Sequence, residues 1–221
     1  MKTNNKVENM CVVCQFCDSS CPRFNADSMG NVNWGDEYNH KIDSLIREGS
    51  IKLLIIGQSP YAIGNTGIAF CKPTWSEMLD GRYSGKTLLC SLGFDLSKAY
   101  QCYNSFSPKE YFFKLVDDGV VFINRYTDID ELNENPYRKR IKSAKYCICL
   151  GQKATMPHTF KCTSYRTREI HPSSYNENVH SVQWNDVWGY HGALVEKIRC
   201  TNSNAAASIK ELIDNINENL T

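Results

Sequence analysis

The sequence predicts a layered α/β sandwich around a mainly parallel sheet. The run IKLLIIG (51–57) is apolar along almost its whole length, which is typical of a strand buried on both faces in a parallel sheet. Further strand-like segments alternate with helix-like segments, the pattern that parallel-sheet units produce. A chain of 221 residues is long enough for one full-sized domain with an appended segment.

The other elements follow from the periodicity of apolar residues and from the breakers between them. Residues 40–49 have apolar side chains at helical spacing and end at Gly49. Strands are expected at 119–124, 145–151 and 164–172, and the last is the least apolar and is placed at an edge. Helices are expected at 107–118, 135–144, 185–200 and 204–220. Residues 22–39 are turn-rich, so we divide the chain into a Cys-rich extension (1–39) and an α/β domain (40–221).

Composition and charge are those of an ordinary globular protein. The net charge is +1, so no global field indicates a nucleic-acid partner. No apolar run reaches the ~20 residues that span a bilayer, and the first residues lack the apolar core of a signal peptide. We expect a monomer without a membrane partner, in the cytoplasm or, in a eukaryote, the nucleus. Two basic stretches (137–145 and 161–168) are either phosphate-facing patches or solvated element ends.

Polar residues follow the expected strands at their carboxyl ends. These are Gln58-Ser59-Pro60-Tyr61, Asn124, Gly151-Gln152 and His171-Pro172-Ser173. Ligands of parallel sheets bind beyond the carboxyl ends of the strands. The sequence therefore predicts a binding site at this edge.

The residues at these strand ends resemble the motifs of the uracil-DNA glycosylase superfamily. The motifs are GQSPY (57–61), GIAF (67–70), VVFIN (120–124) and HPSSY (171–175), in the family's order. The resemblance implies a three-layer α/β/α sandwich with a central four-stranded, mainly parallel sheet. It also implies an enzyme that flips uracil, or a related deaminated base, out of DNA and hydrolyses its N-glycosidic bond.

The same resemblance assigns four residues to base recognition. Phe70 would stack on the base, and the Asn124 amide would pair with the O4 and N3–H groups of uracil. Tyr61 would exclude the methyl group of thymine, and Gln58 would contact the base at the floor of the pocket. For Phe70 and Tyr61, ordinary core packing is the alternative interpretation.

Catalysis would depend on His171 and on the residue at position 59. His171 would hydrogen-bond uracil O2 and stabilise the negative charge that develops there. Ser59 stands where the family normally carries an aspartate that positions water and balances the cationic sugar. A serine can hydrogen-bond a water molecule but carries no charge, so hydrolysis is expected to be slower.

DNA contacts would come from three further residues. Ser76 and Ser173 resemble the family's serines that grip phosphates. Tyr175 occupies the place of an intercalating leucine, and an aromatic ring can also wedge between bases.

Four cysteines near the amino terminus form a metal-binding pattern. Cys11, Cys14, Cys17 and Cys21 follow C-x2-C-x2-C-x3-C-P, a run typical of bacterial ferredoxins. An iron–sulfur cluster, a zinc ion bound by four thiolates and unmetallated thiols all remain possible. Any metal would be structural and not needed for catalysis. Most of the seven other cysteines are expected to be small buried residues.

Three functions compete on these observations. The first is an active glycosylase, favoured by the complete recognition set. The second is a module that binds DNA or a partner after losing most turnover, favoured by Ser59. The third is a redox protein whose function is an iron–sulfur cluster.

Overall fold

A parallel sheet forms the centre of the computed structural model, which describes residues 30–79, 84–103, 107–128, 133–172 and 186–220. The sheet has four strands in the order β2-β1-β3-β4, and every neighbouring pair is parallel. The strands are β1 (Leu53–Gly57), β2 (Val120–Asn124), β3 (Ser143–Leu150) and β4 (Lys161–Glu169). The predicted fold class and the edge position of the fourth strand are confirmed.

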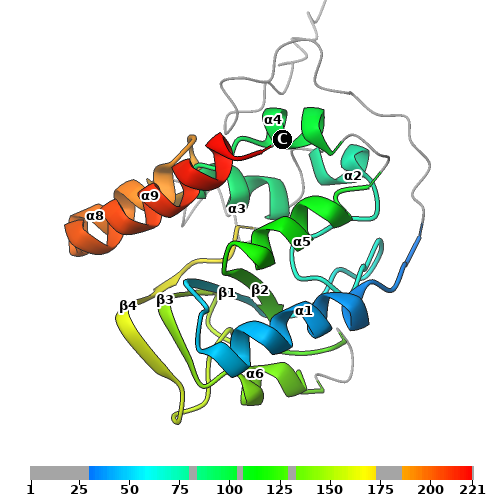
Figure 1. Ribbon diagram of the computed structural model, residues 1–221, viewed down its shortest axis with the longest axis horizontal. Coiled ribbons are helices and arrows are strands. Elements are labelled where there is room, and N and C mark those ends of the chain that lie inside the picture. The colour runs from blue at the N-terminus through cyan, green and yellow to red at the C-terminus, as the bar shows by residue number, and fades with distance from the viewer. Residues whose placement is uncertain (1–29, 80–83, 104–106, 129–132, 173–185, 221) are drawn as a thin grey trace, which may run out of the picture.

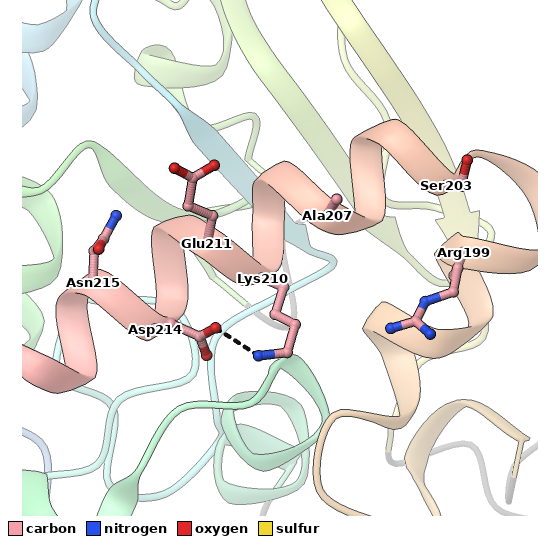
Figure 2. A pocket seen from close by; sticks show the side chains of 7 residues that line it. All are labelled: Arg199, Ser203, Ala207, Lys210, Glu211, Asp214 and Asn215. Atoms are coloured by element: carbon pink, nitrogen blue, oxygen red, sulfur yellow. Dashed lines mark hydrogen bonds and ion pairs between the residues drawn. The ribbon is translucent and has the colours of Figure 1, made fainter.

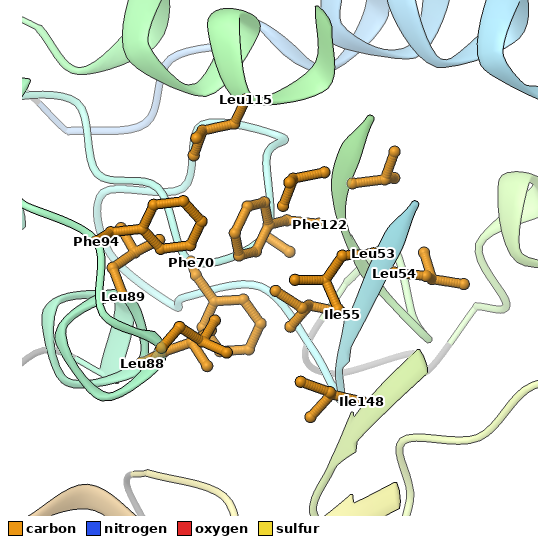
Figure 3. Packing of buried hydrophobic residues seen from close by; sticks show 14 of the residues in the cluster. Leu53, Leu54, Ile55, Phe70, Leu88, Leu89, Phe94, Leu115, Phe122 and Ile148 are labelled. Carbon is orange, nitrogen blue, oxygen red and sulfur yellow. The ribbon is translucent and has the colours of Figure 1, made fainter. Parts of the chain in front are cut away.

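Strand β1 is central and buried along its whole length, which explains its continuous apolar run. Figure 3 shows the core on one side of it, where Leu53 and Ile55 meet Phe122 of β2 and Ile148 of β3. Strand β4 has no buried residue, and its alternation of polar side chains suits an edge.

Helices surround the sheet (Figure 1). In chain order they are α1 (Gly35–Glu48), α2 (Trp75–Leu79), α3 (Ser84–Leu92), α4 (Leu96–Cys102), α5 (Lys109–Asp117), α6 (Pro136–Arg140), α8 (Ala193–Thr201) and α9 (Ser203–Glu218). Helices α3 and α5 cover one face of the sheet, α6 lies on the opposite side, and α8 packs between α3 and α9. The layers are those of an α/β/α sandwich.

Helix α1 protects the outer edge of β2. The Tyr38 hydroxyl oxygen accepts a hydrogen bond from the Phe122 backbone N–H at 2.9 Å, and the Tyr38 side chain is buried. Burial raises the pKa of this hydroxyl above its usual range. An edge N–H that would otherwise be available to another strand is thereby satisfied.

Several predicted boundaries are wrong. Helix α1 begins at Gly35 rather than residue 40, since Val32 and Trp34 donate backbone hydrogen bonds to the loop residues Asn65 and Thr66 and fix the chain before it. Helix α6 ends at Arg140, because β3 already begins at Ser143.

The carboxyl-terminal boundaries differ too. Helix α8 begins only at Ala193, after Gly192 adopts a positive φ of 79°. Helices α2, α3 and α4 were not predicted at all, whereas α9 agrees closely with the predicted 204–220.

Part of the first basic stretch has a structural role. Arg138 is buried, forms an ion pair with Glu134 and donates to the Thr155 carbonyl oxygen. Arg140 pairs with Asp43 at 2.7 Å. A phosphate-facing function for this stretch is therefore weakened, while Arg166 and Arg168 of the second stretch are exposed on β4.

Most of the cysteines outside the amino-terminal cluster are buried, as expected. Cys71, Cys90, Cys147 and Cys149 are buried, Cys102 and Cys162 are half-buried, and Cys200 is exposed.

Among the helices that the structure describes, none combines the length and apolar composition needed to cross a membrane.

Candidate functional site

The carboxyl ends of β1 and β2 lie side by side, as the sequence predicted. Gly57 and Asn124 are register partners in the parallel ladder. The pairing continues past the strands, because Arg125 N–H donates to the Gly57 carbonyl and Tyr126 N–H to the Gln58 carbonyl, each at 3.0 Å. Two loops of the expected site are thus joined by backbone hydrogen bonds.

Gly57 is where two of the residues predicted for base recognition meet. A Cβ atom at this position would lie 2.5 Å from Asn124 Oδ1 and 2.9 Å from Phe70 Cζ. Both distances are too short for any side chain. The absence of a side chain at residue 57 therefore brings the amide of Asn124 and the ring of Phe70 against the same backbone atom.

Phe70 is held in a strained conformation. Its φ is +64°, the left-handed region that non-glycine residues seldom occupy. A Cβ on Gly85 of α3 would lie 2.1 Å from the Phe70 carbonyl oxygen, so helix and loop are in close contact. The ring is buried and meets Phe122 edge-on, with centroids 6.5 Å apart. Local strain kept by such tight packing is common at functional sites.

His171 lies against the Phe70 ring, two residues beyond β4. The ring centroids are 5.8 Å apart and the planes are inclined by 28°, a stacked arrangement. Burial lowers the pKa of His171 to about 4. The imidazole is therefore neutral at pH 7 and can donate a hydrogen bond through one ring nitrogen.

Tyr61 is tied to the start of α3. Its hydroxyl is 2.9 Å from Ser84 Oγ and accepts a hydrogen bond from the Gly85 N–H at 3.0 Å. Lys72 Nζ lies 4.0 Å from the centre of the Tyr61 ring. Tyr61 and Phe70 therefore both contact Gly85, although they lie in different halves of the loop between β1 and α2.

Two of the three predicted serines, Ser59 and Ser76, lie within the described residues. Ser59 lies two residues after the end of β1, and its Oγ atom is buried without a hydrogen-bond partner among the described residues. Ser76 Oγ in α2 is also buried, and it too has no hydrogen-bond partner among the described residues. The Gln58 carbonyl takes part in the loop pairing, and its side chain is half-buried.

Several predicted residues lie outside the described residues. They are Ser173 and Tyr175 of the DNA-contact set and the four cysteines Cys11, Cys14, Cys17 and Cys21. Within the described ranges, no group of three or more His, Cys, Asp or Glu side chains is placed to hold a metal ion.

Two surface hollows lie away from this edge. One, of about 460 Å³, runs along α8 and α9, where Lys210 pairs with Asp214 at 2.5 Å (Figure 2). The other, of about 400 Å³, is lined by residues just before β1 and by residues at the amino ends of β3 and β4, at the opposite end of the sheet. Neither contains a residue that the motifs identified.

Sequence reasoning missed two residues that shape the site, Gly85 and Lys72, and did not foresee the contact that Gly57 makes with Asn124. Gly85 contacts the Phe70 backbone, Gly57 admits the Asn124 amide, and Lys72 lies under the Tyr61 ring. The glycine of GQSPY was part of the motif, but its contact with Asn124 depends on the strand register. Gly85 and Lys72 carry no signal in the sequence, because their roles arise only from how α3 and the loop pack.

No family model, curated protein or solved structure matches this chain.

Proposed function

We propose that this protein is a DNA glycosylase that removes uracil, or a related deaminated base, from DNA. The observation that carries the proposal is that Asn124 and Phe70 both lie against Gly57, while His171 stacks on the Phe70 ring. These side chains supply an amide for the base edge, an aromatic face and a neutral imidazole. A flipped base is read by stacking and by hydrogen bonds to its edge.

The proposed reaction begins with the base stacked on Phe70. Van der Waals contact needs about 3.5 Å between the rings, so His171, which now lies against Phe70, would shift to the edge of the base. Its N–H would then donate to uracil O2. The C1′–N1 bond breaks, its electron pair goes to the uracil ring, and a water molecule adds to C1′. The proton released by that water reaches the departing uracil through solvent.

A neutral histidine suits the proposed role. An imidazole whose pKa is about 4 stays uncharged at pH 7, and it stabilises developing charge by donating a hydrogen bond that strengthens as the base becomes anionic. Ser59 would hold the attacking water through its buried hydroxyl. It offers no negative charge to the sugar cation.

A second candidate is a binding module that holds a flipped base without hydrolysing it. Ser59 is the residue that favours it, since the charge expected at this place is absent. The two functions share the recognition residues and differ only in turnover.

Single-turnover cleavage of a uracil-containing oligonucleotide distinguishes them. We expect the parent to release uracil, His171→Ala to lose about 10²- to 10³-fold in rate, and Ser59→Asp to gain about tenfold. His158→Ala is the matched control, because His158 is exposed on the loop after β3. Tight binding without release of any base would support the binding module instead.

We also propose that the amino-terminal cysteines hold a structural iron–sulfur cluster or zinc ion. Four thiolates suit a tetrahedral zinc ion. In the ferredoxin run the first three cysteines ligate one cluster and the fourth ligates another, so an iron–sulfur cluster here would need one further cysteine of the chain. Protein purified without oxygen should absorb broadly near ~400 nm for the cluster, or contain about one zinc per chain by elemental analysis. Removal of the metal should lower thermal stability and leave the uracil chemistry of a still-folded protein unchanged. A chain free of both metals would refute this part.

A further inference from the structure

The loop between β1 and α2 contains a buried lysine that the proposed reaction does not use. Lys72 has only 1% of its surface exposed, although it is a charged residue two positions after Phe70. Burying an ammonium group is costly unless it is paired. Its surroundings therefore indicate what holds it there.

Lys72 contacts the first half of the loop through two separate interactions. Its Nζ donates a hydrogen bond to the Ile63 carbonyl oxygen at 2.6 Å. The same atom lies 4.0 Å from the centre of the Tyr61 ring, within the range of a cation–π interaction. Burial lowers the pKa of the Lys72 ammonium group, and the nearby Glu77 carboxylate opposes that shift.

The space around this ammonium group is tightly filled. A Cβ on Gly64 would lie 3.0 Å from Lys72 Nζ and 3.3 Å from Glu77 Oε1. Glu77 is itself fixed, because its Oε2 accepts a hydrogen bond from Thr74 Oγ1 at 3.0 Å. The tip of the loop, residues 63 and 64, therefore lies against the oppositely charged side chains of Lys72 and Glu77.

The loop tip does not rest on an apolar core. The Ile63 side chain is 70% exposed, so its position is set by its backbone rather than by burial. The bond from Lys72 to the Ile63 carbonyl is thus a principal restraint on this part of the loop.

We propose that Lys72 is a positioning residue that fixes Tyr61 and, through it, sets selection against a methylated base. The proposal rests on the proposed function and on the role that the family resemblance gives Tyr61, which is to exclude the methyl group of thymine. Lys72 contacts Tyr61 and the loop backbone; it is not assigned a contact with the base. A loosened Tyr61 would admit the larger base.

The experiment compares the parent with Lys72→Met and Lys72→Gln. Methionine removes both interactions, whereas glutamine keeps a donor for the Ile63 carbonyl and loses the charge. Lys86→Met is the matched control, because Lys86 is also buried (3% exposed) and donates at 2.7 Å to a carbonyl outside this loop, that of Leu79.

The first readout is hydrogen exchange of the amides of residues 61–67, which does not depend on activity. We expect faster exchange in Lys72→Met, an intermediate rate in Lys72→Gln, and the parental rate in Lys86→Met. Unchanged exchange in a folded Lys72→Met would overturn the proposal.

The second readout is the ratio of uracil to thymine release from matched oligonucleotides. Lys72→Met should lower this ratio about tenfold, since rejection of one methyl group is worth roughly 10- to 200-fold. The same change in a Tyr61→Leu background should have no further effect, because Lys72 acts through Tyr61. A ratio that is unchanged, or that falls equally in both backgrounds, would refute the selectivity role.

Failure of the proposed function gives a different result. A parent that releases no uracil would reject the glycosylase, and the exchange data alone would then decide whether Lys72 holds Tyr61 and the loop.

Discussion

The two sides of the carboxyl edge are built differently. On the proposed recognition side, Asn124 and Phe70 both lie against Gly57, and Phe70 is kept at φ +64° by the packing around it. On the proposed hydrolysis side, Ser59 offers an unpaired buried hydroxyl within the described part of the chain, and His171 is neutral at pH 7. Neither of the latter residues carries a charge. Under the proposed function, the edge is therefore better equipped to hold a base than to stabilise a sugar cation.

The largest expected effect comes from breaking the recognition side at its centre. Gly57→Ala would place a methyl group 2.5 Å from Asn124 Oδ1 and displace both Asn124 and Phe70. Misplacement by about 1 Å can cost roughly 100-fold in rate, and we expect at least that loss in uracil release. Ile56→Val, one residue earlier, should retain activity at a stability cost of about 1 kcal/mol. Full activity in Gly57→Ala would show that these three residues do not form the site.

A more selective change tests which base the recognition side accepts. Asn124→Asp replaces the amide with a carboxyl group whose hydrogen-bonding pattern favours cytosine, which presents the opposite donor and acceptor order to uracil. We expect the ratio of cytosine to uracil release to rise at least about tenfold, measured on matched oligonucleotides. Asn133→Asp, at an exposed position, should leave the ratio unchanged. An unaltered preference in Asn124→Asp would remove Asn124 from base recognition.

The smallest expected effect concerns the hydrolysis side and is a pH dependence of stability. The pKa of His171 is about 4 in the folded protein, below its ordinary value of about 6.5. The unfolded chain therefore binds more protons between these two pH values. The stabilising contribution is complete above pH ~6.5 and is lost as the pH falls toward 4. With allowance for partial exposure, we expect a change of about 2 kcal/mol.

Urea unfolding at pH 7 and pH 4.5 would measure this change. His171→Leu should remove most of the difference between the two pH values, whereas His158→Leu, at an exposed position, should preserve it. An equal pH dependence in the parent and His171→Leu would mean that the half-buried His171 does not have the lowered pKa on which this prediction depends.

The sheet could be predicted from the sequence because its strands are apolar and separated by clear breakers. The same periodicity located α5 and α9, whose buried faces repeat at helical spacing. Helices α2, α3 and α4 escaped prediction for a physical reason. Helix α3 is buried at every position, including Ser84 and Lys86, so it has no polar face to produce a helical pattern.

The candidate site, like the fold, could be predicted from the sequence only in part. That Gln58, Asn124 and His171 follow strands could be predicted, because parallel strands present their carboxyl ends at one edge. The stacking of His171 on Phe70 and the approach of Gly85 to the Phe70 carbonyl could not, since both depend on side-chain packing between distant segments. The residue roles remain predictions.

The register of β1 and β2 has a consequence for how the protein could be monitored. Gly57 and Asn124 meet only when Leu53 pairs with Val120 and each following residue pairs in step. A slip of β2 by one position would turn its side chains to the other face and bring Ile123 or Arg125 opposite Gly57. If the proposed function holds, recovery of uracil binding after refolding would therefore report that β1 and β2 are correctly aligned.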